Sequence, residues 1–162
     1  MFDWILCVSL YFLRMFFITG AYHRYFSHRT YKTSRVFQFV LAFMAQTSAQ
    51  KGVLWWAAHH RVHHRTSDTP ADPHSMKLYG FWYSHLGWIL GPEYKETHFN
   101  LIQDFTKFPE LRWLNKNHMV PPSLLALGSR EWAGMENGGS IILMASPEGG
   151  GSTLLIGFFL ST

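Results

Sequence analysis

The chain has 162 residues, which predicts one domain, and 48% of them are hydrophobic, 17% aromatic and only 15% charged. This composition favours a membrane protein, although a mean hydropathy of −0.03 argues against a bundle that spans the membrane throughout. The formal net charge is +4, but the basic residues are scattered and no nucleic-acid motif accompanies them, so a nucleic-acid partner is not expected.

The first predicted element is an apolar helix near the start of the chain. Residues 4–19 carry a charge only at Arg14, and with residues 20–22 added the stretch is long enough to cross a bilayer. We therefore expect a membrane helix over residues 1–22. A cleaved signal peptide is disfavoured, because no basic segment precedes the stretch and Arg14 interrupts it. The single cysteine, Cys7, excludes an internal disulfide and is typical of a reducing, cytosol-facing protein.

A first pair of histidines follows, His23 and His28, five residues apart. Five residues of an α-helix rotate a side chain by about 140°, so on one helix these two rings would diverge. Two alternatives stay open: the rings serve different metal ions, or one of them lies beyond the end of the helix.

The next apolar run covers residues 36–49 and is interspersed with Gln, Thr and Ser. It is too short and too polar for a clear membrane span and predicts an interfacial or buried helix. A break is expected at Lys51 and Gly52. The tryptophans that follow, Trp55 and Trp56, suit either an interfacial aromatic belt or the wall of a substrate site.

A second histidine group lies at residues 59–64 and holds four of the ten histidines. On an α-helix His60, His63 and His64 share a face about 100° wide. Neutral imidazoles are good ligands for iron, copper, nickel and zinc, so this face predicts a metal site; the alternative is an accidental, solvated turn. The chain has no HExxH motif and no CxxC pair, which favours oxygen-activating iron or copper over structural zinc.

Residues 66–75 are rich in Ser, Thr, Asp and Pro and predict a loop. Its Asp68 and Asp72 are candidates for the acceptors that orient metal-bound imidazoles; a plain turn role is the alternative. Beyond the loop, residues 81–90 predict a short interfacial helix. Residues 91–117 predict surface helices and turns.

Charge and composition suggest how the chain is organised. All ten histidines and twelve of the fourteen Lys and Arg residues lie between residues 23 and 118, so by the positive-inside tendency we expect this region on the cytoplasmic side. Residues 119–162 form an atypical, partly membrane-like tail. Within it, residues 129–152 are rich in Gly and lack periodicity, which indicates a shifted reading frame or insertion, or a flexible linker.

Four sequence motifs carry a family resemblance: GAYHRYFSHRTYK at 20–32, WAAHHRVHH at 56–64, DTPADPH at 68–74 and SHLGW at 84–88. Over residues 5–122 the chain resembles the membrane fatty acyl desaturases of the stearoyl-CoA type. The resemblance implies an all-α fold of integral membrane helices with a histidine-rich cytosolic helical region. It also implies two iron ions that activate dioxygen, with five matching ligand positions: His23, His28, His60, His63 and His64. In this family the ligands lie in short motifs called histidine boxes: here His23 and His28 belong to the first box and His60, His63 and His64 to the second. The second box begins at His60, so the resemblance does not make His59 a ligand.

The resemblance further implies a fatty acyl-CoA or lipid-linked acyl substrate that receives a cis double bond. Electrons would come from a small carrier such as a b-type cytochrome or a ferredoxin, and membrane lipid would surround the helices. Trp56 and its neighbours would then form walls of the acyl-binding tunnel.

The chain also departs from the family pattern. The family's third box, HxxHH, and a further Asn/His pair have no match, because no histidine follows His118. We therefore expect that this chain alone does not build the complete centre. The alternatives are a catalytically inactive fragment or short paralogue that binds lipid, a membrane metal-binding protein, and a hydroxylase on the same scaffold.

Overall fold

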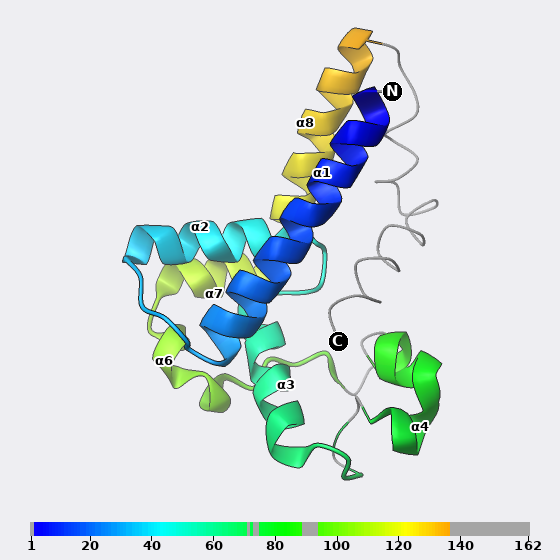
Figure 1. The fold of residues 1–162 in the computed structure, drawn as a ribbon. Coiled ribbons are helices and arrows are strands. Elements are labelled where there is room, and N and C mark those ends of the chain that lie inside the picture. The colour runs from blue at the N-terminus through cyan, green and yellow to red at the C-terminus, as the bar shows by residue number, and fades with distance from the viewer. Residues whose placement is uncertain (1, 71, 73–74, 89–93, 137–162) are drawn as a thin grey trace.

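The structure, a computed structural model, describes residues 2–70, 72, 75–88 and 94–136. Throughout these ranges the regular elements are helices joined by turns and short loops (Figure 1). The predicted all-α class is therefore confirmed.

The chain opens with one long continuous helix. The α-helix α1 (Phe2–Phe17) passes directly into the π-helix η1 (Ile18–Ser27), drawn in blue in Figure 1. Residues Trp4–Ser27 contain an 18-residue window with a mean hydropathy of 1.7 and form the one described stretch that is long and apolar enough to cross a membrane. Large apolar side chains on α1 are exposed, Trp4 at 69% and Phe12 at 66%. The predicted boundary at residue 22 falls inside this helix.

The helix α2 (Arg35–Gln46) matches the predicted short apolar helix. Ser34 begins it as an N-cap, with its hydroxyl accepting a hydrogen bond from the Phe37 N–H at 3.2 Å. Leu41 and Ala45 are buried on one face, while Val36 is 76% exposed on another. The helix is thus buried on the side that faces the other helices.

The helix α3 (Val53–Thr66) begins at the predicted break. Lys51 has φ 68°, and Gly52 is the N-cap. Asn115, more than 50 residues away in sequence, completes the cap, because its Oδ1 accepts hydrogen bonds from Leu54 N–H at 3.0 Å and Trp55 N–H at 2.9 Å. A Cβ atom at Gly52 would collide with the Asn115 side chain, so this close approach requires glycine.

The loop after α3 leads to α4 (Met76–Trp82) and the short π-helix η2 (Tyr83–Gly87). Gly80 interrupts α4 with a kink at φ +76°, a conformation that glycine adopts without strain. Large apolar side chains of α4 are exposed, Trp82 at 67%. The helical segment begins at Met76, five residues before the predicted helix at 81–90, whose last two residues lie outside the described part of the chain.

The segment after residue 94 differs from its prediction as surface helices. It contains η4 (Phe99–Leu101), α6 (Gln103–Thr106) and α7 (Pro109–Lys116). Ile102, Leu111 and Leu114 are fully buried, so this segment supplies part of the core. Leu111 and Leu114 lie on one helix face because they are three residues apart, a short periodicity that the polar composition obscured.

The last described element is α8 (Val120–Glu136). Its two prolines, Pro121 and Pro122, lie in the first turn, where a missing N–H costs no helical hydrogen bond. Because α8 extends to Glu136, residues 129–136 are helical, whereas residues 129–152 were predicted to lack regular periodicity. The rest of that segment lies outside the described residues.

The core forms where η1, α2, α3 and α7 meet (Figure 1). Its largest members that are at most 2% exposed are Ile18, Tyr22, Phe26, Leu54, Ile102, Leu111 and Leu114. Burial of these side chains stabilises the packing of η1 and α3 against each other and against the segment that contains α7. The helices η1 and α3 are the two that carry the histidine boxes.

Candidate metal centre

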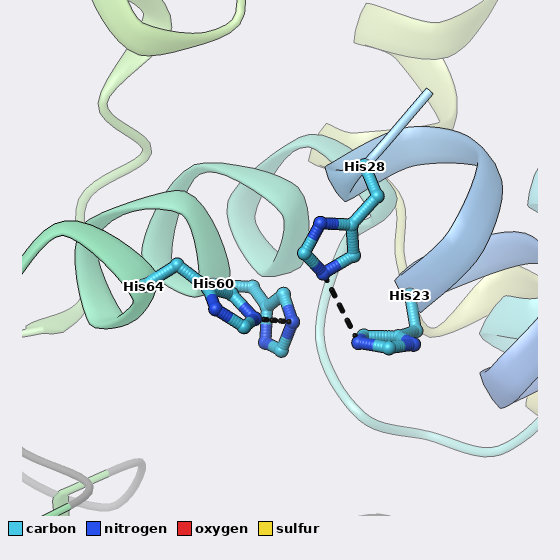
Figure 2. A group of neighbouring side chains, drawn as sticks. All are labelled: His23, His28, His60 and His64. Carbon is cyan, nitrogen blue, oxygen red and sulfur yellow. Dashed lines mark hydrogen bonds between the residues drawn. The ribbon is translucent and has the colours of Figure 1, made fainter. Parts of the chain in front are cut away.

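Four histidines from two helices meet at one place (Figure 2). His23 and His28 come from η1 and its end, and His60 and His64 come from α3. One nitrogen from each ring lies within 4.8 Å of the others. Across the two helices, the ring centroids are 4.8 Å apart for His23 and His60 and 4.5 Å apart for His28 and His64.

The first box depends on the π-helix. The rings of His23 and His28 converge, with their Nε2 atoms 3.1 Å apart, and the structure agrees with the second alternative, because His28 directly follows the last residue of η1. A π-helix bonds each N–H to the carbonyl five residues earlier, so residues five apart lie one turn above each other. The His28 N–H donates to the His23 carbonyl at 3.1 Å in this way, although His28 directly follows the last helical residue.

The second box uses an ordinary α-helix. His60 and His64 are four residues apart, which places them one turn apart on one face, with their Nε2 atoms at 3.0 Å. His63 lies beside the group of four rather than in it. Its ring centroid is 6.0 Å from that of His60 and 5.4 Å from that of His64.

Asp72 anchors the His63 ring. The Asp72 side chain is buried, and its Oδ1 lies 2.8 Å from His63 Nδ1. Its Oδ2 accepts a hydrogen bond from the Asp68 N–H at 3.1 Å. Such a carboxylate fixes the orientation of an imidazole and leaves Nε2 for a metal. Asp68, by contrast, bonds to Asp72 and to the Ser75 hydroxyl in the described part of the chain, so it supports the loop rather than an imidazole.

The electrostatics of α3 favour neutral imidazoles. Burial, followed by repulsion from His23, His64 and His28, lowers the pKa of His60 to about 2. Burial and the neighbouring His28 and His63 also lower the pKa of His64. Uncharged rings keep the nitrogen lone pair that a metal ion requires.

Trp56 contacts the cluster directly. Its ring stacks on His60, with centroids 4.6 Å apart, and on Tyr22, with centroids 5.2 Å apart. It therefore links a cluster histidine to the buried part of η1. The first contact lies within α3, and the second joins α3 to η1.

His59 belongs to a separate aromatic group. It is 6% exposed, its ring centroid lies 4.2 Å from that of Trp55, and its Nδ1 lies 2.9 Å from the Trp55 carbonyl oxygen. Burial lowers the pKa of His59 to about 4. The cluster of four does not include it.

The cluster has an open side. A cavity of about 280 Å³ lies next to it, and His28, His60, His64 and Arg65 are among its lining residues. Two of the four cluster histidines, His28 and His64, are exposed. Further ligands or small molecules therefore have room to reach these imidazoles.

Sequence reasoning missed Arg61 and Asn115. Arg61 joins α3 to the end of η1 and to Asp104, and Asn115 caps α3. Their partners lie 34 to 61 residues away along the chain, so local sequence patterns carry no sign of these contacts. Only the position of Arg61 between two box histidines hints at a role.

The family profile described as fatty acid desaturase matches residues 2–133. The chain belongs to the fatty acid desaturase family.

Several desaturases and a related enzyme are similar to this chain. A probable acyl-CoA desaturase of Schizosaccharomyces pombe is 42% identical over 73 residues, which are 45% of this chain and 15% of that protein. A hex-5-enoyl-[acyl-carrier protein] acetylenase of Moorena producens is 34% identical over 129 residues, 71% of this chain and 39% of the relative. Acyl-CoA desaturase 1 of Saccharomyces cerevisiae is 37% identical over 106 residues, 64% of this chain and 20% of the relative. The matches thus span well under half of the length of these relatives.

Proposed function

We propose that the full-length protein is a membrane-bound, iron- and dioxygen-dependent fatty acyl desaturase that introduces a cis double bond into a saturated acyl chain. One observation carries the proposal: four imidazoles from two separate helices converge within 4.8 Å in a chain of the desaturase family. The similarity to an acyl-CoA desaturase and to an acyl-carrier-protein acetylenase supports an acyl chain carried by CoA or by an acyl-carrier protein.

The donor set suits iron. It consists of imidazoles without thiolates, and the half-buried His60 has its pKa lowered to about 2. We propose that His23, His28, His60, His63 and His64 hold iron, with more ligands from elsewhere in the protein. When bound, two iron ions would let dioxygen accept two electrons from adjacent C–H bonds and two from a donor, forming two water molecules.

The remaining residues of the site would hold these ligands and the substrate. Asp72 keeps the Nδ1 side of His63 occupied, so that Nε2 is left for metal. The Trp56 ring stacks on the His60 ring and would form part of the wall of the acyl-binding tunnel. Asp68 would act on His63 only indirectly, because its backbone N–H donates a hydrogen bond to the Asp72 carboxylate. Such support reduces the freedom of the site before substrate binds.

The location of the cluster suggests a membrane arrangement. His23 lies near the end of the apolar stretch Trp4–Ser27, so the cluster would lie at the membrane surface. The basic residues between 24 and 116 favour the cytoplasmic side, where a small b-type cytochrome or ferredoxin would deliver electrons. Residues 1–162 would form part of one desaturase domain, with the histidine-box region at 23–118.

Product analysis tests the proposal. The full-length protein would be expressed in cells that lack their own acyl desaturase, supplied with saturated fatty acids, and the lipids analysed by gas chromatography and mass spectrometry. We expect a mid-chain cis double bond that disappears in His60→Ala. A hydroxylated product would instead identify a hydroxylase.

A second candidate, a metal- or lipid-binding protein without redox chemistry, is favoured by one observation. The described residues supply one cluster of four imidazoles, whereas two iron ions require more ligands. Metal bound stoichiometrically by the full-length protein, with no modified fatty acid, would support this candidate.

A further inference from the structure

We infer that Arg61 is a positioning residue that fixes the two histidine boxes against each other. Arg61 lies on α3 between His60 and His63, and its side chain donates hydrogen bonds to backbone carbonyls and to one carboxylate. It therefore acts on the cluster through the backbone. The inference rests on the proposed function, because it assumes that the cluster binds metal.

Two of these hydrogen bonds reach the end of η1. Arg61 Nη2 donates to the Phe26 carbonyl at 2.7 Å, and Nε donates to the Ser27 carbonyl at 3.1 Å. The last carbonyls of a helix lack partners within the helix and attract a cation. These two carbonyls directly precede His28, so Arg61 holds the first box at the point where its second histidine leaves the helix.

The other three hydrogen bonds fix the guanidinium from the opposite segment. Nη1 donates to the Leu101 carbonyl and to Asp104 Oδ1, both at 2.9 Å, and Nη2 donates to Asp104 Oδ2 at 2.9 Å. A guanidinium has five N–H groups, so all of them are used. The Asp104 carboxylate also balances the positive charge, which would otherwise repel a metal ion.

Burial makes this link specific to arginine. The side chains of Arg61 and Asp104 are 20% and 15% exposed, and the guanidinium lies 5.8 Å from the Phe105 ring centroid. Lysine has three N–H donors on one atom, so it cannot reach five acceptors spread over two backbone segments and a carboxylate. Loss of such supporting contacts typically weakens metal binding 10- to 100-fold.

Arg35 offers a matched control. It also binds one carboxylate through two nitrogens, with Nε and Nη2 at 2.7 and 2.8 Å from the Glu110 oxygens. This pair joins α2 to α7, and neither residue is part of the histidine cluster. Arg35→Gln therefore removes a bidentate arginine–carboxylate pair of the same chemistry, at a more exposed arginine, without touching the link between the boxes.

Cobalt titration of the full-length protein in detergent tests the inference. Co²⁺ serves as the probe because its visible absorption reports ligand geometry, and circular dichroism with thermal melting of the metal-free protein reports folding. We expect Arg61→Lys to weaken Co²⁺ binding 10- to 100-fold and to change the absorption spectrum. Asp104→Asn, which keeps the Arg61 side chain and its three backbone acceptors, should weaken binding by a smaller factor. Arg35→Gln should bind as the parent does.

The outcomes separate the two proposals. A parent protein that does not bind Co²⁺, or binds it equally well after His60→Ala, would refute the metal site and the proposed function. A parent that binds, with Arg61→Lys and Asp104→Asn both within twofold of its affinity and only their melting temperatures lowered, would overturn the inference. Arg61 would then stabilise the fold alone.

Discussion

The two histidine boxes present the same kind of side chain by different means. In the first box the rings are five residues apart, and a π-helix brings them within 3.1 Å. In the second box His60 and His64 are four residues apart, and an α-helix brings them within 3.0 Å. Each spacing therefore matches the hydrogen-bonding period of the helix that carries it.

The boxes also differ in how they are supported. In the second box the Asp72 carboxylate bonds to His63, the Trp56 ring stacks on His60, and Asn115 caps the start of α3. The first box is held mainly through the backbone at its end, where Arg61 binds two carbonyls. We therefore expect a substitution in the second box to disturb the side-chain contacts that orient its rings. A substitution in the first box should instead disturb the backbone geometry of η1.

The largest expected effect comes from removing a cluster ligand. His60→Ala in the full-length protein should abolish desaturation, because it removes one of the four imidazoles whose nitrogens lie within 4.8 Å of one another. His59→Ala is the matched control on the same helix, since His59 packs on Trp55 outside the cluster. It should lower the melting temperature but keep the activity. An inactive His59→Ala that still folds and binds metal would show that the second box is placed one residue late.

A swap of Ser27 and His28 tests the π-helix. The double substitution Ser27→His and His28→Ser gives the first box the four-residue spacing of the second. Ser27 is buried and its hydroxyl donates a hydrogen bond to the Tyr22 carbonyl, so a histidine at this position would lie in the core rather than beside His23, and metal affinity should fall at least tenfold. Isothermal titration with Co²⁺ measures the effect. Unchanged affinity would mean that the first box adopts α-helical geometry when metal binds.

Asp72→Asn tests the support of the second box. The amide keeps the size of the carboxylate but loses its charge, so the orientation of His63 and the basicity of its ring should suffer. We expect a 10- to 100-fold loss of metal affinity or activity. The same substitution at Asp68, which contacts Asp72 through its backbone N–H, should have a much smaller effect. Equal effects at both positions would indicate a general role of the loop.

The smallest expected effect is at the start of α3. Asn115→Ala removes the acceptor for the Leu54 and Trp55 N–H groups and should cost about 1 kcal/mol of stability, as other helix caps do. A modest decrease in melting temperature with unchanged Co²⁺ affinity would show that the cap stabilises the helix without setting the cluster geometry.

Local pattern predicted several elements of the fold. The apolar stretch at residues 4–19, the break at Lys51 and Gly52, and the helix that carries the second box all follow from composition and periodicity. The burial of Leu111 and Leu114 was not predicted, because the surrounding residues are polar and their partners lie on other helices. The helical start of the segment after residue 128 was missed for a similar reason, since glycine and serine there outweighed its place at the end of a longer helix.

The sequence by itself determined which side chains are available as ligands and that they come in two groups with fixed spacing. Residue type and spacing are local properties, and they also carry the family resemblance. The tertiary structure decided that His23 and His28 converge, that Asp72 rather than Asp68 reaches His63, and that Arg61 links the two boxes. Each of these depends on helix type or on partners distant along the chain, which are fixed only when η1, α3 and the segment around Asp104 pack together.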